Sequence, residues 1–210
     1  MSNKDILCYN FSMYEIELKA HVEDRQALIK KLESFAYFSG AVEKDDTYYG
    51  KTVDGRQIQV RIRKETPFTP KELDLPEVSI DSQKTVIFTY KKKELLDKDG
   101  KAIEVNDEKE CTLDEAAPLE SFLKDVGFKT DIVKHKVVLD WQYNDVLFEL
   151  CKVPPLGDFI EIEIMSHSND PKQIEQTNKK LLAMLAKCGI SEDKIEKRYY
   201  TQMLQELGGK

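Results

Sequence analysis

The clearest chemical signal in the sequence is a short run near its start in which charged and apolar residues alternate. Alternate side chains of an extended strand point to opposite faces, so Glu15, Glu17 and Lys19 would share one face. Two carboxylates and an ammonium group in one row are costly to bury unless other charges compensate them. A divalent cation with a polyanionic ligand would do so. Water on a solvated outer face would also do so, and for a single strand this is the commoner arrangement.

The same alternation recurs, with both signs of charge, along most of the chain. Like-charged residues two apart are Arg61 and Arg63, Lys91 and Lys93, Lys134 and Lys136, and Glu161 and Glu163. Asp140 and Glu149 fall on the charged face of their own segments. Neighbouring like charges repel on an ordinary sheet surface, so their repetition favours a ligand cavity over a wet open face. An open sheet would leave this face in water, whereas a barrel of about eight strands would turn it inward.

A cavity lined by both acidic and basic groups predicts a particular class of ligand. Carboxylate pairs suit Mg²⁺ or Mn²⁺, which complete their coordination with phosphate and water. Rows of arginine and lysine suit phosphate oxygens through charge-assisted hydrogen bonds. A metal-bound polyphosphate, most simply a triphosphate, satisfies both groups.

The elements that would position these residues are short strands and amphipathic helices. Strands are expected at 14–22, 42–50, 57–64, 85–94, 102–110, 129–143, 146–153 and 159–166. Helices are expected at 23–35, 113–126, 172–187 and 195–207. Residues 66–82 contain three prolines without periodicity, which indicates a long surface loop. The pattern predicts an α+β protein with a mostly antiparallel sheet, in one domain spanning 1–210.

Composition narrows the class of protein further. The 210 residues carry a net charge of −7, which argues against a nucleic-acid binder. Four scattered cysteines, without a CxxC pair, indicate free thiols in a reducing compartment, and we expect the cytoplasm. The first twelve residues lack a long apolar stretch, and no segment approaches the ~20 apolar residues of a membrane span, so we expect no membrane partner.

Several of these segments, in order, resemble the CYTH superfamily, the triphosphate tunnel metalloenzymes. Residues 15–19 (EIELK) resemble its ExExK signature, and the other matching segments are 46–49 (DTYY), 60–63 (VRIR), 89–91 (TYK), 133–136 (VKHK) and 156–163 (LGDFIEIE). Residues 198–200 (RYY) resemble the C-terminal segment of the class IV adenylyl cyclases within it. The resemblance implies a closed, antiparallel eight-stranded β-barrel that forms a tunnel, with helices packed outside.

The resemblance also implies roles for individual residues. The metal ligands would be Glu15, Glu17, Glu161 and Glu163, holding Mg²⁺ or Mn²⁺. The triphosphate would be bound by Lys19, Arg61, Arg63, Lys91, Lys134 and Lys136. Glu149 stands where an aspartate is usual, and Lys136 where arginine is common, so bidentate phosphate binding at 136 is in doubt.

The resemblance favours an adenylyl cyclase that converts ATP to cyclic AMP and pyrophosphate. Glu149, Asp140 and Lys91 would take part in this chemistry, with Glu149 or Asp140 assisting deprotonation of the attacking hydroxyl. A triphosphatase acting on inorganic or thiamine triphosphate is the alternative, because its metal and basic residues would barely differ. A non-catalytic module that binds polyphosphate or nucleotides is a third hypothesis, and a homodimer is left open.

Overall fold

The computed structural model describes residues 14–71, 73, 84–98, 101–168 and 170–208, with the backbone alone for 91–98 and 101–108. The strands are β1 (Tyr14–His21), β2 (Tyr37–Val53), β3 (Arg56–Pro67), β4 (Thr85–Lys98), β5 (Lys101–Leu113), β6 (Lys129–Tyr143), β7 (Val146–Val153) and β8 (Gly157–Ser166). The helices are α1 (Arg25–Glu33), α2 (Ala117–Asp125), α3 (Pro171–Lys187) and α4 (Tyr200–Gly208), with a 3₁₀ turn, η1 (Glu192–Lys194), before α4. Most of the expected loop at 66–82 lies outside the described residues.

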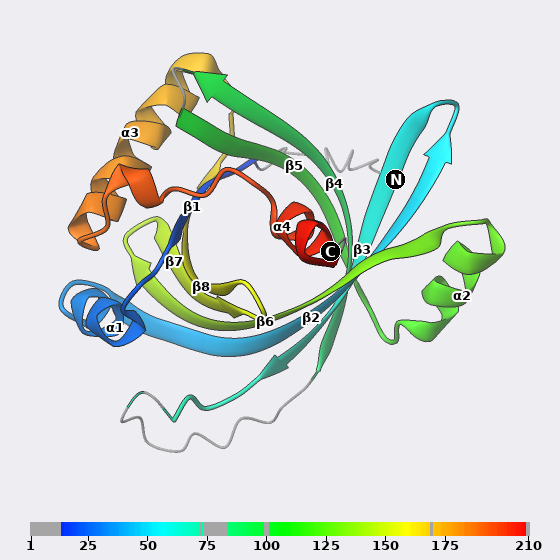
Figure 1. Ribbon diagram of the computed structural model, residues 1–210, viewed down its shortest axis with the longest axis horizontal. Helices are drawn as coiled ribbons and strands as arrows, with labels where there is room; N and C mark the ends of the chain where they lie inside the picture. The colour runs from blue at the N-terminus through cyan, green and yellow to red at the C-terminus, as the bar shows by residue number, and fades with distance from the viewer. Residues whose placement is uncertain (1–13, 72, 74–83, 99–100, 169, 209–210) are drawn as a thin grey trace, which may run out of the picture.

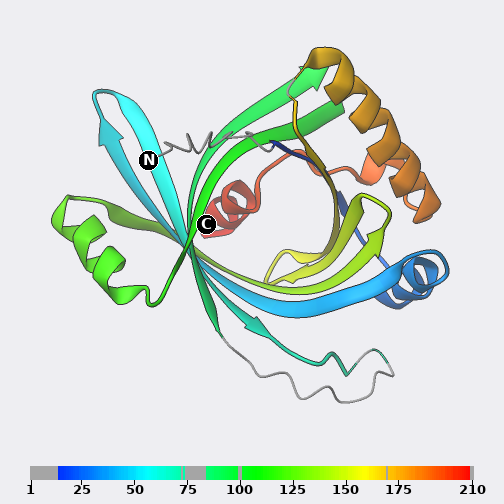
Figure 2. The same cartoon turned by 180° about the vertical axis from the view of Figure 1, so that it is seen from behind.

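The strands form one antiparallel sheet in the order β1-β5-β4-β3-β2-β6-β7-β8, and the sheet curls until β5 meets β1 again. Figure 1 shows this curled sheet around α4, with the β2–β3 hairpin and α2 projecting to one side, and Figure 2 shows the same arrangement from behind. Asp54 and Gly55, at the tip of the hairpin, both have positive φ angles, of 49° and 75°. Two-residue turns of this kind match the twist of the flanking strands.

The expected closed barrel with every helix outside is wrong. Among the described residues, β1 pairs with β8 from Tyr14 to His21, but with β5 over only four residue pairs, which end at Glu17. Beyond this short seam, the free edge of β1 is taken by the segment that leads into α4. Ala20 forms a bridge to Ile195, and the Glu196 N–H donates to the Lys19 carbonyl at 2.8 Å. The sheet is therefore curled rather than a continuous tube, because the chain passes through its wall.

The convex face of the sheet carries the main hydrophobic core. Its outward-pointing residues include Ile16 and Leu18 of β1, Phe148 of β7, and Ile160 and Ile162 of β8. The apolar stripes of α1 and α3 cover them, through Leu28, Ile29, Leu32, Ile174, Leu181 and Leu185. Asp24 and Asp170 cap the starts of these two helices by accepting hydrogen bonds from backbone N–H groups.

The concave face changes character along its length. Near one end it is apolar, and Tyr200 and Met203 of α4 pack there in a cluster with Val138, Cys151, Val153 and Phe159. The strand positions of this cluster continue the same parity as the charged residues, since Cys151 follows Glu149 and Phe159 precedes Glu161 by two. α4 therefore lies inside the curl because an apolar patch on the inner face matches its own apolar side.

The largest differences from the expected starting residues are at β2 and at the last helix. β2 starts at Tyr37 and runs through Gly40 and a register shift, whereas we expected it to begin at Val42. The last helix begins at Tyr200 rather than Ile195, because residues before it bond to β1. Over the residues that the structure describes, no helix has the length and apolar character needed to cross a bilayer.

Candidate active site

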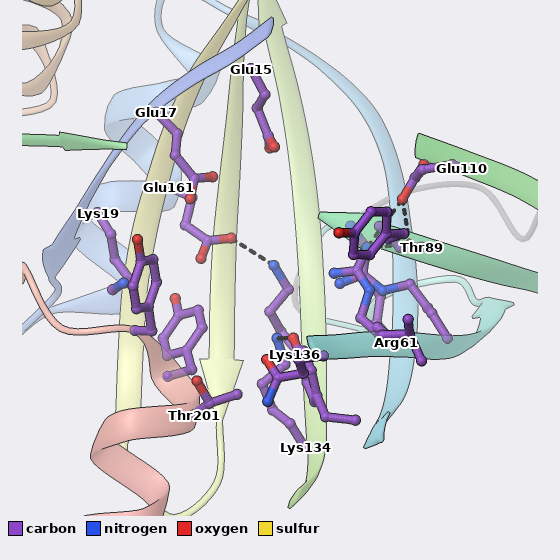
Figure 3. Close-up of a pocket in the computed structure, with 18 of the residues that line it drawn as sticks. Glu15, Glu17, Lys19, Arg61, Thr89, Glu110, Lys134, Lys136, Glu161 and Thr201 are labelled. Carbon is purple, nitrogen blue, oxygen red and sulfur yellow. Dashed lines mark hydrogen bonds and ion pairs between the residues drawn. The ribbon is translucent and has the colours of Figure 1, made fainter. Parts of the chain in front are cut away.

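A cavity of about 770 Å³ occupies the concave side of the sheet. Side chains from all eight strands and from the start of α4 line it. In Figure 3, Glu15, Glu17 and Glu161 lie along one side, Lys134 and Lys136 project from β6, and Arg61, Thr89 and Glu110 lie opposite the carboxylates. The strand alternation seen in the sequence thus brings acidic and basic groups from distant parts of the chain to one space.

Three carboxylates form the first acidic group, consisting of Glu15, Glu17 and Glu163. One carboxylate oxygen from each lies within 4.8 Å of the others. Glu17 and Glu163 are register partners on β1 and β8, so the backbone pairing fixes their proximity. Burial, with the negative charge of Glu149, raises the pKa of Glu163 to about 7. A set of oxygen donors with this much negative charge fits a hard divalent cation such as Mg²⁺ or Mn²⁺.

Two buried lysines hold the second acidic group, formed by Glu149 and Glu161. The Lys136 ammonium donates to Glu149 Oε2 at 2.7 Å and to Glu161 Oε2 at 2.6 Å. The Lys44 ammonium donates to Glu149 Oε1 at 2.6 Å. Burial opposes ionisation of Glu149, but Lys136 and Lys44 outweigh it and hold the pKa of this carboxyl well below its usual value. Cys151 adds its Sγ atom at 3.4 Å from Glu161 Oε2.

Asp46 organises the basic side of the cavity. It is fully buried, accepts two hydrogen bonds from Arg63, and lies 2.9 Å from the Lys134 ammonium. Despite burial, the charges of Lys134 and Arg63 keep the pKa of Asp46 well below its usual value. Arg63 is its register partner on β3, and Lys134 is its register partner on β6.

A further cation, Arg61, lies two residues before Arg63 on β3. Arg61 donates to the Thr89 hydroxyl oxygen at 2.9 Å and to Glu110 at 3.2 Å. The Thr89 hydroxyl in turn donates to Glu110 at 2.6 Å. Tyr48, the register partner of Arg61, is buried beside Lys134, and the charge of Lys134 lowers its pKa against the effect of burial.

Tyr200 of α4 contributes an aromatic surface to the cavity. Its ring centroid lies 4.6 Å from the Lys19 ammonium and 5.2 Å from the Lys134 ammonium. The ring also contacts Phe159 edge to face, with the centroids 5.1 Å apart. Ammonium groups at these distances are attracted to the negative face of an aromatic ring. α4 therefore interacts with two of the expected phosphate-binding residues.

The structure places most of the residues that the sequence suggested in this cavity. Those lining it are Glu15, Glu17, Lys19, Arg61, Arg63, Lys134, Lys136, Glu149, Glu161 and Glu163. Glu161 joins Glu149 rather than the group of Glu15, Glu17 and Glu163. The side chain of Lys91 lies outside the part of the chain that is described.

Asp140 lies beside the cavity rather than in its lining. It is the register partner of Glu149, and its Oδ1 atom is buried without a hydrogen-bond partner. Burial, with the negative charge of Glu149, raises the pKa of Asp140 to about 7. Asp140 therefore lies next to Glu149 but does not line the cavity.

Sequence reasoning gave no site role to several residues that contribute to the cavity. These are Lys44, Tyr48, Thr89, Glu110 and Tyr200, which line it, and Asp46, which anchors Arg63 and Lys134. Lys44, Asp46 and Tyr48 alternate along β2, so the parity that revealed the other strands would have found them. Tyr200 carried no such signal, because its position depends on where α4 packs.

This chain is similar to a known protein family and to several solved structures. A model of the CYTH domain matches residues 13–200. A structure from Pyrococcus horikoshii OT3 is 24% identical and aligns with a TM-score of 0.71 over 92% of this chain and 99% of that chain. A candidate adenylate cyclase from Vibrio parahaemolyticus is 16% identical, with a TM-score of 0.61 over 91% and 98% of the two chains.

A more distant structure has the same architecture. A candidate adenylyl cyclase from Hippeastrum, whose dominant activity is that of a triphosphatase, is 13% identical, with a TM-score of 0.54 over 94% and 96% of the two chains. At these identities the structural likeness shows a shared fold. The search of curated proteins gave no match. Because the family model spans nearly the whole chain, the protein belongs to the CYTH domain family.

Proposed function

We propose that this protein is an enzyme that uses a divalent metal ion to act on a triphosphate in the cavity. The observation that carries this proposal is that the carboxylates Glu15, Glu17 and Glu163 share the cavity with a set of cations. In this proposal the three carboxylates hold Mg²⁺ or Mn²⁺. The phosphate oxygens are bound by Lys19, Arg61, Arg63, Lys134 and Lys136, with Lys91 as a further candidate.

The reaction that we place first is cyclisation of ATP to cyclic AMP and pyrophosphate. The 3′ oxygen of the ribose would bond to the α-phosphorus while the bond from that phosphorus to the bridging oxygen breaks. A divalent ion supplies positive charge that stabilises the phosphoryl groups and the leaving pyrophosphate. The cationic side chains would orient the phosphate chain, so that the two oxygens lie in line with the α-phosphorus.

An uncharged part of the lining supports a nucleoside triphosphate as the substrate. Gln57, Ile58, Gln59 and Val60 of β3, with Tyr90 of β4, line the cavity next to Arg61. The amide groups of Gln57 and Gln59 offer hydrogen bonds to a purine, whereas inorganic triphosphate has no use for such a surface.

The roles of Glu149 and Asp140 follow from their surroundings. Both oxygens of Glu149 accept hydrogen bonds from lysines, and its pKa is well below the usual value, which makes it a poor proton acceptor. We therefore propose that Glu149 positions Lys136 and Lys44. Asp140, with a pKa of about 7, is the better base of the two, although it lies behind the lining.

Hydrolysis of a triphosphate is the second candidate, and the position of α4 favours it. Tyr200 stands over Lys19 and Lys134, and α4 fills one end of the concave face. A ligand without a nucleoside would need less of the remaining space. In that reaction water would attack the terminal phosphorus, and the same carboxylates and cations would serve.

Product analysis separates these reactions. The protein is incubated with Mn²⁺ or Mg²⁺ and, in separate reactions, with ATP, inorganic triphosphate or thiamine triphosphate. Cyclic AMP with pyrophosphate identifies a cyclase, and orthophosphate identifies a triphosphatase. Glu15→Gln and Glu163→Gln should abolish either activity, whereas Glu33→Gln, on the exposed side of α1, should not. Absence of turnover with all three compounds would refute the proposed enzyme.

A further inference from the structure

The group formed by Glu149 and Glu161 contains cations supplied by the protein itself. Three of its four carboxylate oxygens accept hydrogen bonds from the ammonium groups of Lys136 and Lys44, at 2.6–2.7 Å. All four residues are at most 8% exposed. Such short, buried contacts between opposite charges are the strong class of charge-assisted hydrogen bonds.

The backbone fixes this arrangement. Glu149 and Glu161 are register partners on β7 and β8, and Lys44 and Lys136 are register partners on β2 and β6. The strands β2, β6, β7 and β8 are consecutive in the sheet, so the backbone places the two lysines beside the two glutamates. A metal ion between Glu149 and Glu161 would have to displace the Lys136 ammonium, which lies between them.

Charge balance separates this group from the other acidic group. Glu149 and Glu161 contribute two negative charges, and Lys44 and Lys136 contribute two positive charges, so the four side chains are neutral together. A divalent ion added there would bring two uncompensated charges into a buried site, which is strongly unfavourable. At Glu15, Glu17 and Glu163 the same ion would meet three carboxylates.

We infer that this protein binds one divalent ion, at Glu15, Glu17 and Glu163, and that the Lys136 ammonium takes the place of a second ion between Glu149 and Glu161. The inference rests on the metal site of the proposed function and adds the number of ions and the identity of the second cation. Lys136 uses two of its three N–H donors for the carboxylates. The third N–H can donate a hydrogen bond to a phosphate oxygen that a metal ion at this position would coordinate.

Counting bound Mn²⁺ tests the inference without any measurement of turnover. The full chain is titrated with Mn²⁺ alone, and free Mn²⁺ is measured from its electron paramagnetic resonance signal. We expect one bound ion per chain, without the broadening that two neighbouring ions produce. Two ions in the unaltered protein, or none, would overturn the inference.

Removal of the ammonium group gives a second test. Lys136→Met keeps the length of the side chain and leaves the carboxylates in place, so this variant should gain a second, weaker Mn²⁺ site. Lys44→Met in addition should strengthen that site, because the last compensating charge is removed. Lys152→Met, at an exposed position of β7, is the matched control and should still bind one ion. A folded Lys136→Met variant that binds a single ion would contradict the inference, and the count in the unaltered protein decides if the variant does not fold.

The location of the first ion is tested separately. Glu163→Gln should abolish binding of the single ion, whereas Glu161→Gln should retain it, and the reverse result would overturn the inference. The metal count and the proposed function fail independently. One bound ion without turnover of any triphosphate would refute the enzyme alone, and two ions with turnover would refute the inference alone.

Discussion

Asp46 and Arg63 face each other across β2 and β3, joined by two hydrogen bonds from the guanidinium Nε and Nη2 atoms, at 2.7 and 3.1 Å. The carboxylate also lies 2.9 Å from the Lys134 ammonium. It thus compensates two cations that we propose for phosphate binding. Asp46 holds them in fixed positions while the cavity contains no phosphate, and this preorganisation lowers the cost of binding.

Asp46→Asn should destabilise the protein strongly. The change removes the charge that Arg63 and the buried Lys134 share and leaves Arg63 with the more distant Glu65 carboxylate, at 3.7 Å, which costs about 3–5 kcal/mol of unfolding free energy. Urea unfolding measures the effect. Asp45→Asn is the control, because the neighbouring Asp45 is exposed and its described ion pair is with the half-buried His135. A loss below about 1 kcal/mol, the value typical of exposed pairs, would contradict this account.

The metal-free protein should become less stable as the pH rises from about 5 to 7. Glu163 has a usual pKa of 4.5 but a folded-state pKa of about 7. Between these values the folded state holds a proton that the unfolded state has lost, so raising the pH favours unfolding. The shift corresponds to at most about 3 kcal/mol. Unfolding in chelator-treated samples across this range measures the slope.

Glu163→Gln should flatten this pH dependence, and saturating Mn²⁺ should do the same in the unaltered protein. Part of the slope should remain, because Asp140 has a similarly raised pKa. Glu33→Gln, at an exposed position, should leave the slope unchanged. An identical slope in the Glu163→Gln variant would show that another group controls the stability in this range.

Inorganic triphosphate with Mn²⁺ should raise the melting temperature. A ligand that binds only the folded protein stabilises it by about 2.7 kcal/mol when its concentration is a hundred times the dissociation constant. Arg63→Met should reduce the shift, because the guanidinium group lies at the cavity, whereas Lys152→Met should preserve it. Differential scanning fluorimetry measures both. Equal shifts in the two variants would argue against binding in this cavity.

Replacement of Tyr200 should show what its ring contributes. Tyr200→Phe keeps the aromatic face over Lys19 and Lys134, whereas Tyr200→Leu loses it together with the edge-to-face contact to Phe159. We expect the leucine variant to be less stable than the phenylalanine variant by about 1–3 kcal/mol. Chemical unfolding of the two variants gives this difference directly, and equal stability would mean that the ring acts only by filling space.

The sequence predicted most of the sheet because strand parity is a local property. Alternation placed Glu15, Arg61, Lys134 and Glu161 on one face, and all four line the cavity. The opposite, convex face is covered by the apolar stripes of α1 and α3. The family resemblance added the order of the motifs, and the match over 13–200 confirms the family.

What the sequence missed depends on contacts between distant segments. The end of the pairing between β1 and β5 at Glu17 cannot be read from either strand, because both strands continue beyond it. The charges of the inner face do not predict the position of α4, which depends on the apolar patch formed there by Cys151, Val153 and Phe159. The division of the carboxylates was also missed, since it depends on the reach of Lys136 to Glu149 and Glu161.

The passage of the chain through the wall places the segment before α4 on the same edge of β1 that β5 uses. Ile195 and Glu196 bond to the edge of β1 just past the point where β5 leaves it. They therefore occupy the edge of β1 along which further pairing with β5 would have to form. A segment that contributes no strand to the sheet therefore lies where β5 would otherwise continue along β1.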